Sequence, residues 1–117
     1  MGKINILIVD DIKDNIYSLR QLIEDNFNFN CYEAVSVIDA LNILMEKDIN
    51  IIFSDIQMPE IDGFEFINYL KDIPVILVSG ICLSQENKNY LSNYKNITFL
   101  AKPIDTSELI LAINKYI

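Results

Sequence analysis

Short apolar runs without alternation constrain the fold of this chain more than any other feature of its sequence. Three of them are continuous and rich in β-branched residues: Ile6-Leu7-Ile8-Val9, Ile51-Ile52-Phe53 and Val75-Ile76-Leu77-Val78. A strand that is buried on both faces has this pattern, because neither of its faces needs polar residues. The runs therefore predict a parallel sheet that is covered by helices.

Five such runs recur along the chain, and a segment with helical periodicity follows each of them. We expect the strands at residues 4–9, 29–34, 50–54, 74–79 and 97–101. Parallel strands need right-handed helical crossovers, so the helices fall on both faces of the sheet. A chain of 117 residues suits one α/β domain, which we place at residues 1–117. The number of units favours a doubly wound, flavodoxin-like (βα)5 sheet with strand order 2-1-3-4-5 over a six-stranded Rossmann sheet.

Apolar residues three and four apart predict the buried face of each helix. In chain order, the expected buried sets are Ile12, Ile16, Leu19 and Ile23; Ile38, Leu41, Leu44 and Met45; Phe64, Ile67 and Leu70; and Leu109, Ala112, Ile113 and Tyr116. Asp105 or Thr106 can cap the last helix. The segment 84–94 is a weaker helix because it is rich in asparagine, and its apolar side consists of Tyr90, Leu91 and Tyr94.

Composition excludes several classes of function. The chain has no histidine, so it can form neither Ser-His nor Cys-His nucleophile pairs and no His-ligated metal site. The three glycines, Gly2, Gly63 and Gly80, lie too far apart for a glycine-rich phosphate loop. A net charge of −8 disfavours binding to nucleic acid or to an anionic membrane, because phosphate recognition needs clustered Lys and Arg.

The two cysteines and the amino-terminal segment indicate the compartment. Cys31 and Cys82 fit neither a disulfide framework nor a zinc-ligand spacing, so we expect two free thiols. The apolar run near the amino terminus ends at Asp10 and Asp11, unlike a signal peptide, and no run approaches the length of a membrane span. We therefore expect a cytoplasmic domain that contacts neither membrane nor nucleic acid.

Polar groups follow four of the expected strands at their carboxyl ends: Asp10 and Asp11, Asp55, Ser79, and Lys102. These four strands are neighbours in the order 2-1-3-4-5, so the groups converge on one crevice. A single Asp after a strand is usually a helix N-cap, whereas three clustered carboxylates repel one another by about 4 kcal/mol per pair at a spacing of about 4 Å. A divalent cation removes this repulsion, and a site without His or thiolate favours Mg²⁺.

Lys102 and Ser79 extend this site beyond a metal cluster. A lone Lys before a proline can be an ordinary surface residue, but beside carboxylates and Mg²⁺ it adds the positive charge that a phosphoryl group needs. Ser79 supplies a hydroxyl donor, and Gly80 allows the backbone to approach closely. Together these groups describe phosphoryl transfer to an aspartate rather than hydrolysis of a bound nucleotide.

On these residues the chain resembles a response-regulator receiver domain from end to end. The matching segments are Val9-Asp10-Asp11, residues 55–63, Ser79-Gly80 and Lys102-Pro103. The resemblance implies a two-component phosphorelay, in which a histidine kinase or a phosphotransfer protein donates a phosphoryl group to the domain. It implies a signalling receiver with self-catalysed phosphorylation and dephosphorylation rather than an enzyme, and a hybrid histidine kinase is one candidate for the parent protein.

The resemblance also implies a role for each residue at the strand ends. Asp55 is expected to be the phosphoacceptor. Asp11, Asp55 and the backbone carbonyl of Gln57 are expected to ligate Mg²⁺ directly, while Asp10 acts through a metal-bound water. Lys102 is expected to pair with the phosphoryl oxygens.

A switch and an output surface follow from the same resemblance. The Ser79 hydroxyl is expected to move toward the phosphoryl group, and Phe99 to rotate into the space behind it. The segment 84–94 is expected to respond most, and a homodimer through the fourth helix, fifth strand and fifth helix is one expected form. The family's cis bond is expected at Lys102-Pro103. The interval from Asp55 to Ser79 is shorter than usual, so the third helix or the loop after it is expected to be short.

Two other classes compete with the receiver. A phosphatase of the haloacid-dehalogenase type needs an acid two residues after its aspartate nucleophile, and this chain has Gln57 there. A pseudo-receiver, a purely structural interaction domain, usually lacks one of the acids or the lysine, and this chain keeps Asp10, Asp11, Asp55 and Lys102. A stoichiometric phosphate that is stable in acid and labile in alkali would separate the receiver from both.

Overall fold

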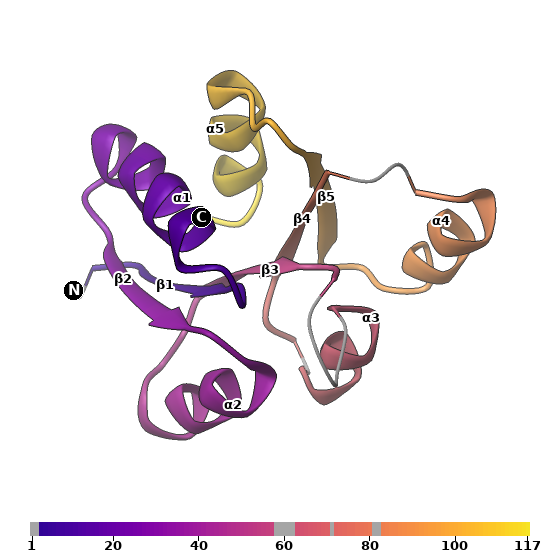
Figure 1. Ribbon diagram of the computed structural model, residues 1–117, viewed down its shortest axis with the longest axis horizontal. Coiled ribbons are helices and arrows are strands. Elements are labelled where there is room, and N and C mark those ends of the chain that lie inside the picture. The colour runs from indigo at the N-terminus through magenta and orange to yellow at the C-terminus, as the bar shows by residue number, and fades with distance from the viewer. Residues whose placement is uncertain (1–2, 58–62, 71, 81–82) are drawn as a thin grey trace.

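The expected strands form one parallel sheet in the computed structural model, which describes residues 3–57, 63–70, 72–80 and 83–117. The sheet order is β2-β1-β3-β4-β5 (Figure 1). The strands are β1 (Asn5–Val9), β2 (Asn30–Ala34), β3 (Ile51–Asp55), β4 (Val75–Ser79) and β5 (Ile97–Ala101). The predicted fold class and strand order are confirmed.

Helices cover both faces of this sheet. They are α1 (Lys13–Asn26), α2 (Val37–Glu46), α3 (Gly63–Phe66), α4 (Gln85–Leu91) and α5 (Thr106–Asn114), with a 3₁₀ turn η1 (Ile67–Tyr69) directly after α3. One face packs against α1 and α5, and the other packs against α2, α3, η1 and α4 (Figure 1). The α3 helix is short, as the interval from Asp55 to Ser79 predicts.

Burial on both faces explains why the strands show no polar alternation. In β1, Ile6 and Ile8 pack on the α1–α5 side, whereas Leu7 and Val9 pack on the α2–α4 side. All four side chains are at most 2% exposed. Successive residues of a strand point to opposite faces, so a sheet that is covered twice needs apolar residues at every position.

Asparagines fix the register at the amino-terminal edge of the sheet, opposite the site. The backbone N–H of Asn5 donates to Oδ1 of Asn50 at 2.8 Å, and Nδ2 of Asn30 donates to Oδ1 of Asn5 at 3.0 Å. The side-chain Nδ2 of Asn5 also donates to the backbone carbonyl of Asp48 at 2.8 Å. These bonds tie β1 to the starts of β2 and β3, and a fixed register determines where each strand ends.

Two of the predicted helix faces are wrong in part. Ile12 is the residue before α1 and is 51% exposed, whereas Ile16, Leu19 and Ile23 are buried as predicted. In α2 the exposed residues are Ile38, at 60%, and Met45, at 85%. The buried side of α2 consists of Val37 and Ala40, with Leu41 and Leu44 packed beside them. Because α2 is apolar around much of its circumference, periodicity alone did not identify the side that faces the core.

The carboxyl-terminal part of the chain agrees with its predictions. Asp105 is the N-cap of α5 and accepts hydrogen bonds from the backbone N–H groups of Ser107, at 2.8 Å, and Glu108, at 3.3 Å. The hydrogen bond from the Ser107 side chain, together with these N–H groups, lowers the pKa of Asp105. Leu109, Ala112 and Ile113 are buried, and Tyr116 packs beside them. The Lys102-Pro103 bond is cis.

Two further predictions concern the cysteines and membrane spans. Cys31 is a half-buried free thiol, whereas Cys82 and the side chain of Phe64 lie outside the described residues. Burial raises the pKa of the Cys31 thiol. Within the described part of the chain, every helix is too short or too polar to cross a membrane.

Candidate functional site

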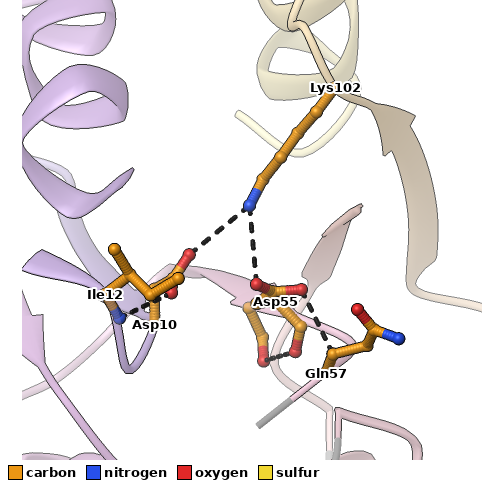
Figure 2. Close-up of polar contacts among 6 residues, drawn as sticks. Asp10, Ile12, Asp55, Gln57 and Lys102 are labelled. Carbon is orange, nitrogen blue, oxygen red and sulfur yellow. Dashed lines mark hydrogen bonds and ion pairs between the residues drawn. The ribbon is translucent and has the colours of Figure 1, made fainter. Parts of the chain in front are cut away.

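The site is built from charged side chains at the carboxyl ends of three strands. Asp10 follows β1, Asp55 ends β3, and Lys102 reaches toward both from the connection between β5 and α5 (Figure 2). The Lys102 ammonium lies 3.6 Å from Oδ2 of Asp10 and 3.4 Å from Oδ2 of Asp55. One ammonium therefore bridges two carboxylates from neighbouring strands.

Asp10 is the most buried charged group of the site. Only 5% of its surface is exposed, and its Oδ1 accepts a hydrogen bond from the backbone N–H of Ile12 at 2.9 Å. Burial raises the pKa of Asp10 above its ordinary value, and the negative charge of Asp55 raises it further. The Ile12 N–H and the charge of Lys102 oppose this shift without cancelling it. The site therefore holds a carboxylate that gains from a further positive charge.

Asp11 adds a third carboxylate to the cluster. Its side chain is exposed, and one carboxylate oxygen from each of Asp10, Asp11 and Asp55 lies within 4.8 Å of the others. Three oxygen donors without nitrogen or sulfur suit a hard divalent cation such as Mg²⁺. The residues that the sequence predicts as ligands thus come together, and their chemistry fits that ion.

Backbone and hydroxyl groups hold Asp55 in its position. The backbone N–H of Gln57 donates to Oδ1 of Asp55 at 3.1 Å, which brings the Gln57 backbone beside the carboxylate (Figure 2). The Ser54 hydroxyl donates to the backbone carbonyl of Asp55 at 3.0 Å and is almost fully buried. Ser54 is not among the residues that the sequence predicts for the site, although a polar residue inside an otherwise apolar run is a visible signal.

Asn15 is a second neighbour that the sequence analysis did not assign. It lies in the first turn of α1, is half-buried, and forms a side-chain hydrogen bond that favours the charged form of Asp10. Asn15 and Asp10 also line a cavity of about 310 Å³ that extends from the site between α1 and the connection from β5 to α5. Its walls are mostly apolar, and Asp55 and Lys102 border it.

Ser79 and Phe99 lie on adjacent strands beside this cluster. Ser79 ends β4 and is 1% exposed, and its backbone carbonyl accepts a hydrogen bond from the Lys102 N–H at 2.9 Å. In the sheet Ser79 pairs with Ala101, and Phe99 pairs with Leu77, two residues earlier on each strand. The period of two in a strand places Ser79 and Phe99 on the same face, toward α4.

Comparisons with known proteins agree with this arrangement. The family model of the response regulator receiver domain matches residues 6–114. The sensor histidine kinase RcsC of Escherichia coli (strain K12) is 32% identical over 106 residues, which are 85% of this chain and 11% of RcsC. The polar-differentiation response regulator DivK of Brucella ovis is 29% identical over 119 residues, which cover 97% of this chain and 95% of DivK.

A solved structure supports the fold. The chemotaxis protein CheY4 of Vibrio cholerae superposes with a TM-score of 0.86 at 21% identity, covering 99% of this chain and 100% of CheY4. The chain thus spans nearly all of two small relatives and a small part of a sensor kinase. With the family match over residues 6–114, the chain belongs to the response regulator receiver domains, the signalling receivers of two-component systems.

Proposed function

We propose that Asp55 is the phosphoacceptor of this receiver and that residues 1–117 form the receiver unit. The observation that carries the proposal is the placement of the Lys102 ammonium 3.4 Å from Asp55 and 3.6 Å from Asp10, beside the oxygen cluster of Asp10, Asp11 and Asp55. A carboxylate nucleophile next to an ammonium and a cation site suits the transfer of an anionic phosphoryl group.

The proposed transfer is a displacement at phosphorus. A carboxylate oxygen of Asp55 forms a bond to phosphorus, the bond between phosphorus and the imidazole nitrogen of a phosphohistidine donor breaks, and the imidazole leaves and takes up a proton from solvent. Lys102 pairs with the phosphoryl oxygens, and its charge offsets the negative charge that arrives with the group. The domain is proposed to catalyse its own phosphorylation and dephosphorylation.

Asp11, Asp55 and the Gln57 carbonyl are proposed to hold Mg²⁺ directly, and Asp10 through a water molecule. When bound, this ion would supply positive charge to the carboxylates and to the phosphoryl oxygens. Support comes from the three converging oxygen donors and from burial of Asp10 with its raised pKa. Both observations indicate a site that gains from a divalent cation.

Ser79 and Phe99 are proposed to transmit the change to the output surface. The Ser79 hydroxyl would move toward the phosphoryl group on Asp55, and Phe99 would rotate into the space that it leaves. Support comes from their positions on the same face of adjacent strands, with Ser79 next to the Lys102 backbone.

The proposed donor is a histidine kinase or a phosphotransfer domain, and the output partner is a further protein or a tethered domain. The similarity to RcsC supports a hybrid histidine kinase as one parent, while the similarity to DivK supports a small response regulator. We propose that the domain works in the cytoplasm, and that a homodimer, if it forms, uses α4, β5 and α5.

Phosphate incorporation tests the acceptor assignment. Wild type should incorporate about one phosphate per chain from phosphoramidate or acetyl phosphate with Mg²⁺, stable in acid and labile in alkali. Asp55→Asn should abolish incorporation, because an amide is not a nucleophile here. The matched control is Asp105→Asn, which changes an aspartate that caps α5 outside the site. Incorporation that persists in Asp55→Asn would show that the acceptor is another residue.

Chelation tests the metal assignment separately. With EDTA, incorporation should fall at least about tenfold, since the carboxylates and the phosphoryl group would then repel without a bridging cation. After removal of the donor, the phosphate should be lost from the isolated domain, faster with Mg²⁺ than with EDTA. Equal incorporation with Mg²⁺ and with EDTA would contradict the metal role and leave the acceptor assignment intact.

A further inference from the structure

A cluster of three polar side chains joins η1 to α4 and to the turn that follows α4. Oδ1 of Asn68 accepts a hydrogen bond from the Tyr94 hydroxyl at 2.7 Å and lies 3.2 Å from the Tyr90 hydroxyl. The two hydroxyls are 3.2 Å apart, and the two rings lie with centroids 5.5 Å apart at a tilt of 56°. We call Asn68, Tyr90 and Tyr94 the clasp.

The two tyrosines do not contribute equally to the clasp. Each contact needs a hydroxyl proton, because Asn68 contributes an acceptor, and two tyrosines carry two such protons. Two of the three contacts can therefore be hydrogen bonds at one time. The short Tyr94 bond of 2.7 Å is one of them, and Tyr90 shares its proton between Asn68 and Tyr94 at 3.2 Å each.

The clasp connects two segments that leave the candidate site. Asn68 belongs to the connection that starts after Asp55 and runs through α3 and η1 to β4. Tyr90 and Tyr94 belong to the connection that starts after Ser79 and runs through α4 to β5. In Figure 1, α3 and α4 lie on the same side of the sheet, each following a strand that ends at the site.

Apolar packing alone holds α4 weakly. Leu91 is the buried residue of this seven-residue helix and is 9% exposed, and Tyr90 and Tyr94 are half-buried against the same cluster. A cavity of about 310 Å³ borders Tyr94 and separates Leu70 and Ile73 from Asn93 and Ile97. The hydroxyl contacts therefore add to a small apolar contact in fixing α4, and Tyr94 borders a cavity.

We propose that the clasp couples α4 to the segment after Asp55, so that a change at the phosphorylation site reaches α4 through Asn68, Tyr94 and Tyr90. The proposal rests on the proposed function of Asp55 and adds a route of regulation to it. Two sites are coupled when both bias the same two-state element, and α4 is that element here. Without the clasp, α4 opens more often and follows the site less.

Hydrogen exchange without ligand tests whether the clasp holds α4. In Tyr94→Phe, amides of residues 85–91 should exchange about fivefold faster than in wild type, the effect of losing one hydrogen bond of ordinary strength. Asn68→Ala should give a larger increase, since both tyrosines lose their contact with Asn68 and only the contact between the two hydroxyls is left. The matched control is Tyr116→Phe, which removes a hydroxyl that lies 2.6 Å from Thr98 on the opposite face of the sheet. This control should leave α4 unchanged.

Exchange with Mg²⁺ and beryllofluoride, a phosphoryl analogue, tests the coupling. Wild type and Tyr116→Phe should change their exchange both around Asp55 and in residues 85–91. In Asn68→Ala the change around Asp55 should persist, while the change in α4 falls to less than about half. Asn68→Asp keeps an acceptor for both hydroxyls and should retain the α4 response.

The outcomes separate this proposal from the proposed function. If wild type shows no change around Asp55, the proposed function fails, and the coupling fails with it. If the change appears around Asp55 but Asn68→Ala transmits it to α4 as fully as wild type, the coupling is overturned and the proposed function stands. Equal loss of the α4 response in Tyr116→Phe would also overturn the coupling.

Discussion

The two faces of the sheet have similar apolar cores, but α1 on one face and α4 on the other are held in different ways. On one face, the 14-residue α1 buries Ile16, Leu19 and Ile23, and α5 buries a further set of apolar residues. On the other face, α3 buries Phe66, whereas the seven-residue α4 buries Leu91 alone among its residues and depends also on the hydroxyls of Tyr90 and Tyr94. A helix held by several large apolar side chains is rigid, whereas a helix held by one such side chain and a few polar contacts opens locally at lower free energy.

This difference matches the two tasks of a receiver. Asp10 and Asp55 follow strands whose residues are almost fully buried, so the carboxylates and Lys102 are held at fixed distances. A segment that reports on the site must instead have two arrangements that are close in free energy. The weakly packed α4 meets that requirement, whereas a helix packed as tightly as α1 would not.

Truncation of one buried side chain on each face should give the largest effects. Ile23→Ala should lower the free energy of unfolding by about 4 kcal/mol, because Ile23 is fully buried in the α1–α5 core. Leu91→Ala should cost about 2 kcal/mol, because Leu91 is 9% exposed and its surroundings at the margin of the cluster can relax. Urea denaturation of both variants measures the difference. An equal or larger loss in Leu91→Ala would contradict the contrast between α1 and α4.

Removal of one charge should stabilise the rigid region. Asp10→Asn keeps an acceptor for the Ile12 N–H and removes the repulsion with the other carboxylates of the cluster. The free energy of unfolding should rise, because burial and the charge of Asp55, which raise the pKa of Asp10, together outweigh its ion pair with Lys102. Thermal denaturation measures it, and Mg²⁺ should stabilise wild type more than the variant.

The same group predicts a pH dependence with a definite sign. The folded-state pKa of Asp10 is raised, so between its ordinary value and the raised value the folded protein binds the proton more tightly than the unfolded chain. The charged form of Asp10 therefore lowers the free energy of unfolding when the pH is above the raised pKa. This loss disappears as the pH falls from the raised pKa to the ordinary pKa, because Asp10 then becomes protonated in the folded protein. The difference in the free energy of unfolding between Asp10→Asn and wild type should therefore shrink as the pH falls through this range. A difference that grows with acidity would contradict the prediction.

The parts of the fold and site that could be predicted from the sequence depend on burial and on strand order. Runs such as Ile6 to Val9 are readable because both faces are covered, and once the order is 2-1-3-4-5, the strand ends place Asp10, Asp55 and Lys102 together. Neither the prediction of the strands nor that of the strand-end cluster depends on knowing the conformation of a side chain.

The parts that could not be predicted depend on tertiary placement. Ile38 and Met45 have the spacing of a buried face, but Val37 and Ala40 face the core instead, and only the packing of α2 on the sheet decides between the two sides. The spacing of Tyr90 and Tyr94 predicts one side of a helix, yet their hydroxyls contact Asn68 from another connection. A pattern along one segment contains no information about such a partner.

Removal of an N-cap from α2 and from α4 should sharpen the comparison. The hydroxyl of Ser36 accepts from the Asp39 N–H, and that of Ser84 accepts from the Asn87 N–H, each at 3.1 Å. Either Ser→Ala change should destabilise its helix by about 1 kcal/mol. In Ser36→Ala the loss should appear in global unfolding by urea. In Ser84→Ala it should appear mainly as faster hydrogen exchange of α4, since that helix opens without unfolding the sheet. A full global loss in Ser84→Ala would show that α4 is part of the rigid core.

The smallest effect is expected at Gly80, directly after β4. A Cβ at this position would meet nothing within 4 Å, and the Gly80 backbone is not in the left-handed region that favours glycine. Gly80→Ala should therefore raise the free energy of unfolding by about 0.5 kcal/mol, because alanine restricts the unfolded chain more than glycine does. If Gly80 instead serves a close approach of the backbone to the phosphoryl group on Asp55, the same variant should be more stable and yet take up phosphate more slowly. Urea denaturation and phosphoramidate labelling of one protein sample distinguish these results. Lower stability would instead show that the connection from β4 to α4 needs the backbone freedom of glycine. Gly80 would then be the residue at which the chain passes from the rigidly held site to the responsive α4.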